Sequence, residues 1–145
     1  MDPNTLPPLS EFKHSVDVQI RFNDIDILGH LNNTVYFSFY DTGKAYFFEH
    51  ILGGDIDWRR VESVIANVDC AYMQSIYFGQ RLQVRTRCME IREKSFRLQQ
   101  VLVDPETETI HSAAETVMVC FDPATKKSKE IPYNYRTALV KSMNN

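Results

Sequence analysis

The sequence predicts an α+β domain in which a curved antiparallel sheet of five strands wraps around one long central helix. One segment of about five turns carries apolar residues at helical spacing, and five segments alternate apolar with polar residues, as half-buried strands do. A helix of this length can bury its apolar surface by lying across a sheet that curls around it. With 145 residues, 43% of them hydrophobic, the chain fills one core, so residues 1–145 are predicted to form a single domain.

The N-terminal part is predicted to be a loose arm followed by the first strand. Residues 1–11 are rich in proline and polar side chains and carry no periodic pattern. From His14 to Phe22, polar and apolar side chains alternate, which is the period-two pattern of a strand with one buried face. Order is therefore expected to begin near Phe12.

The long helix is predicted over residues 34–52. Tyr36, Tyr40, Gly43 and Phe47 follow helical spacing and belong to a largely buried face. Gly43 lowers helix propensity. Either its missing side chain lets a sheet or a partner approach the helix closely, or the helix simply tolerates it.

Four further strands and a short helix are predicted after the long helix. The strands are residues 64–73, 79–91, 95–103 and 109–121. Short turns join the last three strands into an antiparallel meander, and Pro132 opens an amphipathic helix that reaches about Met143. Such a sheet leaves an edge and an apolar face without a partner. We therefore expect a homodimer that joins edges or faces, and that could pair again into a homotetramer.

Composition and charge argue against several classes of function. The formal net charge of −3 gives no general electrostatic footprint for nucleic acid or for an anionic membrane, and no apolar run is long enough to span a bilayer. The three cysteines lie in strand-like segments without the close paired spacing of a zinc or redox site. We predict buried thiols in a reducing cytoplasm, and neither a metal nor a cofactor, because no histidine and acid cluster has metal-ligand spacing.

Polar residues concentrate between the first strand and the long helix. The run Asp24-Ile25-Asp26-Ile27-Leu28-Gly29, an Asp-x-Asp-x-x-Gly loop ahead of an aromatic helix, resembles the hotdog-fold 4-hydroxybenzoyl-CoA thioesterase-like family. The next residues, Gly29-His30-Leu31-Asn32-Asn33, are similar to the His-x-Asn-Asn element of acyl-carrier-protein thioesterases, a neighbouring branch. The resemblance covers nearly the whole chain. It implies a hotdog fold and a hydrolase of fatty acid metabolism that cleaves an acyl-CoA or acyl-carrier-protein thioester.

The resemblance assigns chemical roles to three residues of this loop. It implies that Asp26 acts as the nucleophile or as the general base for water, and a carboxylate suits either role. It places the donor for the developing oxyanion at the backbone N–H of Asn33, where a helix N-terminus offers unpaired N–H groups. His30 is predicted to orient the carboxylate or to contact the substrate, rather than to transfer the proton itself.

Other residues near the loop have structural alternatives. Asp24 is expected to satisfy backbone amides of the turn, and the same alternative is open for Asp26. Asn32 is predicted to contact the substrate, and either Asn32 or Asn33 could instead act as the helix N-cap, a position that asparagine favours. Tyr36 is predicted to line an acyl channel, although an aromatic residue at helical spacing is more often part of a core.

The chain departs at two positions from the plant-type members of the neighbouring acyl-carrier-protein thioesterase branch. Those relatives have an asparagine two residues after the aspartate and a further acid on a later strand, where this chain has Leu28 and Ser75. The departure favours a simpler scheme with a single carboxylate.

A second group of polar residues, near another turn, is basic. Arg92, Lys94 and Arg97 could meet the phosphates of coenzyme A or the acidic surface of a carrier protein, although a solvated turn explains them equally simply.

Two other functions remain compatible with such a fold. A hydratase or dehydratase acting on a thioester typically carries a different Asp/His arrangement on the helix side, and the Asp-x-Asp-x-x-Gly-His loop argues against it. A non-catalytic module that binds acyl thioesters would keep the fold without the reaction. The presence of Asp26 in an intact loop argues against such a module.

Overall fold

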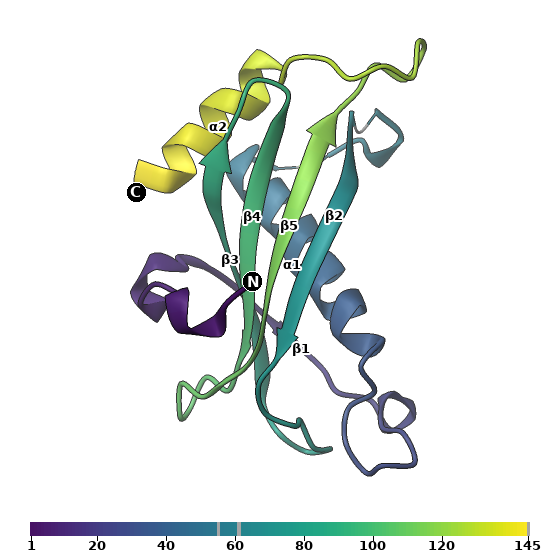
Figure 1. The fold of residues 1–145 in the computed structure, drawn as a ribbon, viewed down its shortest axis with the longest axis vertical. Helices are drawn as coiled ribbons and strands as arrows, with labels where there is room; N and C mark the ends of the chain where they lie inside the picture. The colour runs from purple at the N-terminus through teal and green to yellow at the C-terminus, as the bar shows by residue number, and fades with distance from the viewer. Residues whose placement is uncertain (55, 61, 145) are drawn as a thin grey trace.

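A five-stranded antiparallel sheet and one long helix form the body of the protein (Figure 1). The computed structural model describes residues 1–54, 56–60 and 62–144. The strands are β1 (His14–Val18), β2 (Ser63–Tyr72), β3 (Leu82–Ile91), β4 (Ser95–Val103) and β5 (Ile110–Cys120). Their order in the sheet is β1-β3-β4-β5-β2, so β1 and β2 form the two edges. The predicted hotdog arrangement is confirmed.

The long helix α1 (Val35–Ile51) lies across one face of the sheet, and a second helix, α2 (Tyr133–Asn144), lies beyond its C-terminal end (Figure 1). Gly43 stands where α1 approaches the sheet most closely. A Cβ there would overlap the Val84 side chain and lie 2.8 Å from Gln100 Nε2. The first alternative for Gly43 is therefore confirmed, because any larger residue would push α1 off the strands.

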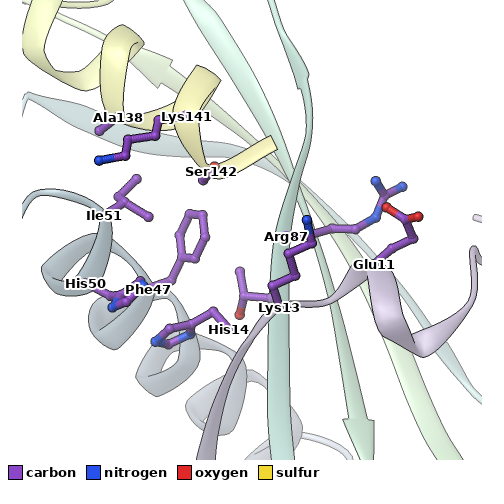
Figure 2. A pocket seen from close by; sticks show the side chains of 11 residues that line it. Glu11, Lys13, His14, Phe47, His50, Ile51, Arg87, Ala138, Lys141 and Ser142 are labelled. Atoms are coloured by element: carbon purple, nitrogen blue, oxygen red, sulfur yellow. The ribbon is translucent and has the colours of Figure 1, made fainter. Parts of the chain in front are cut away.

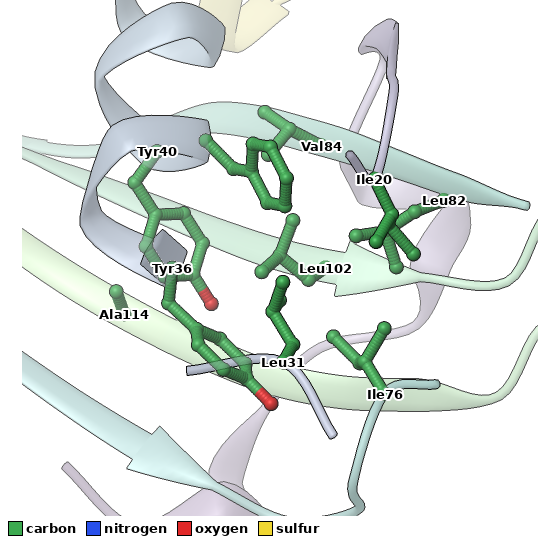
Figure 3. Packing of buried hydrophobic residues seen from close by; sticks show 10 residues of the cluster. Ile20, Leu31, Tyr36, Tyr40, Ile76, Leu82, Val84, Leu102 and Ala114 are labelled. Carbon is green, nitrogen blue, oxygen red and sulfur yellow. The ribbon is translucent and has the colours of Figure 1, made fainter. Parts of the chain in front are cut away.

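Two apolar clusters fill the space between α1 and the sheet. Toward the N-terminal end of α1, Tyr36 and Tyr40 pack with Leu31, Ile76 and Leu102 (Figure 3). Toward the C-terminal end, the helix packs on other strand residues and on α2. The members of that second cluster include Phe47, Phe48, Phe96, Leu98 and Leu139. Each buried side chain of this size stabilises the fold by roughly 1.5–3 kcal/mol relative to exposure.

A few buried polar groups sit within this apolar layer. The Gln100 amide donates to the Tyr40 carbonyl oxygen and to Thr86 Oγ1, each at 3.0 Å. The Tyr40 hydroxyl donates to Ser112 Oγ at 2.6 Å, and burial raises the pKa of Tyr40 well above its ordinary value. These bonds fix the rotation of α1 over the strands, because a buried donor left without an acceptor is costly.

The first strand is shorter than predicted. Strand β1 ends at Val18, where its partner β3 begins at Leu82, so no strand remains to pair with residues 19–22. The backbone instead turns into a 3₁₀ helix at Phe22–Asp24, and the Phe22 side chain is 80% exposed. Alternation of side chains continues past the end of the strand, but the hydrogen-bonding partner does not.

The N-terminal segment, predicted to be loose, lies against the face of the sheet opposite α1. It contains two 3₁₀ turns, at Pro3–Thr5 and Leu9–Glu11. Its apolar side chains, with Phe12, pack on Val101 and Ala113, and the terminal ammonium pairs with Asp69. Leucines spaced among prolines gave no periodic signal, but the sheet offers them an apolar surface to cover.

The bounds of the other predicted strands and helices agree with the structure within a few residues. Cys88 and Cys120 are buried thiols and Cys70 is partly buried, and all three are free. Along the described chain, no helix has the length and apolar character needed to cross a membrane.

Candidate active site

The loop between β1 and α1 is a small closed turn. Ile25 and Leu31 form an isolated antiparallel bridge, and the Asp26 N–H donates to the His30 carbonyl oxygen at 3.2 Å. Gly29 closes the turn with a φ of +86°, a conformation that side chains disfavour. The Leu31 N–H donates to the Ile76 carbonyl oxygen at 2.7 Å, which ties the loop to the segment after β2.

Asp24 has a structural role in this loop. Its side chain is 2% exposed and accepts hydrogen bonds from the Arg21 backbone N–H at 2.8 Å and from the Arg21 guanidinium at 3.0 Å. Burial alone would raise the pKa of the Asp24 carboxyl, but the hydrogen bonds and charge of Arg21 outweigh it and hold the pKa below its ordinary value. Asp24 is thus fully engaged within the protein.

Unlike the buried Asp24, Asp26 is partly exposed. One carboxylate oxygen accepts from the Leu28 N–H at 2.9 Å, and the other accepts from the Asn32 side-chain amide at 3.2 Å. The Asn32 side-chain oxygen in turn accepts from the Thr34 N–H at 2.9 Å and from the Thr34 hydroxyl at 2.6 Å. Asn32 therefore connects the carboxylate to the first turn of α1 and fixes its direction.

The backbone N–H of Asn33, just before α1, is available as a donor. Val35 N–H donates to the Asn32 carbonyl oxygen at 3.0 Å, but no acceptor among the described residues takes the Asn33 N–H. The Tyr72 hydroxyl, from the end of β2, donates to the Asn33 carbonyl oxygen at 3.1 Å. This contact holds the Asn33 carbonyl group in place, while the Asn33 N–H stays open to a ligand.

Asp26 and Asn33 line the same cavity of about 290 Å³. His30, Tyr36, Tyr72, Gln74 and Ser75 add to its polar lining, and its apolar walls come from Leu28, Leu31 and Met73. Burial, followed by the charge of Cys70, raises the pKa of Tyr36. The same causes raise the pKa of Tyr72 to about 12. Both tyrosines are therefore neutral hydrogen-bond donors near pH 7, and Asp26 is the sole carboxylate among the described residues that line the cavity.

The structure brings four of the five predicted site residues into this cavity: Asp26, His30, Asn33 and Tyr36. Asn32 is the exception, because its side chain is used by Asp26 and Thr34. The His30 ring makes no hydrogen bond within the described chain and lies edge-on to Tyr77, with ring centroids 6.4 Å apart. It does not orient the carboxylate here; Asn32 does.

Sequence reasoning missed Tyr72 and Gln74 as cavity residues. Tyr72 belongs to an alternating strand pattern, and nothing in that pattern shows that the end of β2 meets the start of α1. In the basic turn after β3, Arg92 pairs with Glu90 at 3.1 Å and Arg97 pairs with Glu115 at 3.5 Å, so neighbouring acids offset part of its positive charge. No three His, Cys, Asp or Glu side chains in the described ranges could jointly hold a metal ion.

The loop and the fold predict a thioesterase-like protein, and a comparison with known families agrees with this prediction. Residues 20–139 match the thioesterase-like superfamily, so the chain belongs to that family. Family membership supports thioester hydrolysis as the general activity. No curated protein matches the chain in sequence.

Solved structures with the same fold are numerous. A predicted thioesterase from Bacillus stearothermophilus is 23% identical, with a TM-score of 0.80 over 88% of this chain and 94% of that one. A thioesterase from Thermus thermophilus, solved with coenzyme A and zinc, is also 23% identical, with a TM-score of 0.80 over 90% and 94%. A 1,4-dihydroxy-2-naphthoyl-CoA thioesterase from Synechocystis is 15% identical, with a TM-score of 0.77 over 87% and 94%.

Proposed function

We propose that this protein hydrolyses an acyl-CoA thioester, with the Asp26 carboxylate as nucleophile or general base and the Asn33 backbone N–H as oxyanion donor. One observation carries the proposal: Asp26 lines the same cavity as Asn33, whose backbone N–H has no acceptor among the described residues. A thioester carbonyl placed between them would meet an electron-pair donor on its carbon and a hydrogen-bond donor on its oxygen. The helix N-terminus adds favourable potential for the negative charge that develops there.

The residues around Asp26 support each step of this reaction. Hydrogen bonds from Leu28 and Asn32 hold the carboxylate in one orientation, which reduces the entropy cost of attack. In the nucleophile scheme, Asp26 displaces the thiolate to form an anhydride that water then cleaves. In the general-base scheme, Asp26 takes a proton from the attacking water. A substrate contact by His30 is supported by its position in the cavity lining and by its ring, which has no hydrogen-bond partner among the described residues.

Coenzyme A is the carrier that we favour over a carrier protein. The Thermus thermophilus relative was solved with coenzyme A, and this chain has the same fold. Leu28, Leu31 and Tyr36 give the cavity an apolar wall for an acyl group. A carrier-protein substrate stays an open alternative. We also propose that the protein is located in the cytoplasm.

A thiol-release assay tests the proposal. Wild type and Asp26→Asn are compared on short, long, branched and aromatic acyl-CoA esters and on an acyl-carrier protein. We expect turnover of at least one coenzyme A ester and a loss of about 10³-fold in kcat for the variant, because the reaction loses its carboxylate. Full turnover by the variant would remove Asp26 from the chemistry. Thermal shifts by the esters without turnover would instead support a binding module.

We also propose a homodimer formed through the edge strand β2. Val64, Ile65, Val68 and Tyr72 of this strand are each 37–48% exposed, and β2 pairs with β5 alone. A long apolar edge of this kind is normally covered. Because Tyr72 also lines the Asp26 cavity, a second chain on β2 would lie beside the site. Sedimentation equilibrium should give about twice the 16.9 kDa chain mass, and a monomer at micromolar concentration would contradict this interface.

A further inference from the structure

A second cavity of about 290 Å³ lies at the opposite end of α1. It is enclosed by the last turns of α1 and α2, the residues leading into β1, and the middle of β3 (Figure 2). None of its lining residues is shared with the Asp26 cavity. Nothing in the proposed hydrolysis uses this space.

Positive charge surrounds this cavity although the chain as a whole carries a formal net charge of −3. Lys13 and Lys141 line it from different elements (Figure 2), and neither ammonium has an ion-pair or hydrogen-bond partner in the described part of the chain. Arg87 also lines it, but its Nε donates to Gln99 at 2.8 Å, and its guanidinium turns toward Glu11 (Figure 2). Glu11 is the one acid among the described lining residues.

Two histidines add further capacity to bind an anion. The rings of His14 and His50 lie side by side with centroids 5.3 Å apart (Figure 2). His14 Nδ1 is buried and has no hydrogen-bond partner, which is uncommon and leaves a polar atom for a ligand to satisfy. Burial lowers the pKa of His14, and the charge of His50 lowers it further. A negative group beside the pair would favour the protonated rings.

The C-terminus of α1 repels an anion in this cavity less strongly than a helix C-terminus with unpaired carbonyl groups would. Its last carbonyl oxygens accept hydrogen bonds from the residues that follow: Leu52 N–H donates to Phe48 O and Gly54 N–H to Glu49 O, each at 3.0 Å. The partial negative charge of the helix end is thus largely met within the protein. The cations around the cavity therefore determine its potential.

Apolar side chains form the interior of the cavity. Phe47 is 2% exposed and lies between the histidines and α2, while Ile51 and Ala138 form the wall toward α2 (Figure 2). A fully hydrated inorganic anion would gain nothing from this surface. An organic anion would bury its apolar body there and keep its charge near the lysines and histidines.

We propose that this second cavity binds a monocarboxylic acid in its carboxylate form, with the apolar body of the acid against Phe47 and Ile51 and its charge among Lys13, Lys141 and the two histidines. The volume suits a small ligand of this kind, since it lies at the lower limit for ligand sites. The proposal is independent of the activity assigned to Asp26.

Isothermal titration with octanoate tests the site. Wild type is compared with Lys141→Glu and with the matched control Lys127→Glu, which makes the same charge change in the exposed turn after β5. We expect one bound octanoate per chain, an affinity at least about tenfold weaker in Lys141→Glu, and a wild-type affinity in Lys127→Glu. Equal weakening in both variants, or no saturable binding to the folded wild type, would overturn the proposal.

Two further measurements place the ligand. Octanoate should shift the side-chain NMR signals of His14 and His50 in both wild type and Asp26→Asn; shifts of His30 alone would place the acid in the other cavity and overturn the proposal. Inorganic phosphate at equal concentration should displace little octanoate, because it cannot use the apolar wall. Displacement by phosphate as efficient as by a second carboxylic acid would reduce the site to a patch of positive charge.

The pH dependence follows from the charges that face the histidines. They are Glu11 and Lys13 before β1, Arg87 on β3 and Lys141 on α2. Burial lowers the pKa of His14, and a bound carboxylate would favour its protonated form, so binding should take up a proton as the pH falls. Octanoate should therefore bind more tightly at pH 6 than at pH 8, and His14→Gln should reduce this difference; an affinity independent of pH in wild type would contradict the role given to the histidines.

Discussion

The two ends of helix α1 hold cavities of the same size, about 290 Å³, with opposite chemistry. The N-terminal end presents one carboxylate, Asp26, beside a free backbone N–H. The C-terminal end presents a histidine pair and two lysines that have no ion-pair partner among residues 1–54, 56–60 and 62–144. The first arrangement suits a neutral, polarisable carbonyl, because it offers a nucleophile or base and an oxyanion donor. The second suits a group that already carries negative charge.

The difference shows how one helix can serve two sites. At its N-terminus the unpaired N–H groups are an intrinsic property of the helix, and the protein needs only to place a carboxylate opposite them. At its C-terminus the intrinsic potential is negative, so binding of an anion requires capping of the carbonyls and several cations from other elements. The carboxylate and the N–H of the first site accordingly come from one loop, with the start of α1 and the end of β2 completing the cavity, whereas the second site is built from four separate segments.

The Gly43→Ala variant tests whether the position of α1 over the sheet, and with it the position of both helix ends, depends on the glycine at residue 43. Its Cβ would overlap Val84, so α1 must move away from the sheet. We expect a loss of about 3 kcal/mol in the free energy of unfolding, measured by denaturant titration. The reverse substitution on the other helix, Ala138→Gly, removes a methyl group from α2 and serves as a milder control. A Gly43→Ala variant as stable as wild type would contradict the close approach of α1 to β3.

Asp24→Asn tests the division of labour between the two aspartates of the loop. It removes the charged partner of Arg21 and weakens buried hydrogen bonds, so the free energy of unfolding should fall by about 2 kcal/mol at pH 7. Because the pKa of Asp24 is lowered in the folded state, its contribution is present above the unfolded pKa, near 4, and is lost as the pH falls through the folded value. Wild type and variant should therefore converge in stability at low pH; a constant difference down to pH 2 would refute the Arg21 explanation.

Periodicity predicted most of the fold because each strand meets a partner along its whole length. Strand β4 was predicted over residues 95–103, and the structure has Ser95–Val103. The prediction for β1 ran too far because pairing ends where β3 begins at Leu82, which no local pattern reveals. The contacts of the N-terminal segment also depend on a distant surface, the outer face of β4 and β5.

The site was predictable in part because its central residues lie close together in the sequence. Asp26, His30 and Asn33 come from one continuous loop, so a resemblance along ten residues was enough to group them. Asn32 was assigned to the substrate because sequence does not show which side chain the Asp26 carboxylate will bind. The cavity at the other end of α1 left no sequence signal, because Lys13, His50, Arg87 and Lys141 lie far apart in the chain.

The rate of thiol release by Asp26→Asn, compared with Asp24→Asn at a temperature where both are folded, tests the central claim most directly. The two variants each remove one carboxylate, two residues apart, from the same loop. We predict that Asp26→Asn loses about 10³-fold in kcat with wild-type stability, whereas Asp24→Asn keeps kcat within severalfold despite its lower stability. The opposite pattern, with catalysis lost in Asp24→Asn and kept in Asp26→Asn, would contradict the assignment of the active site.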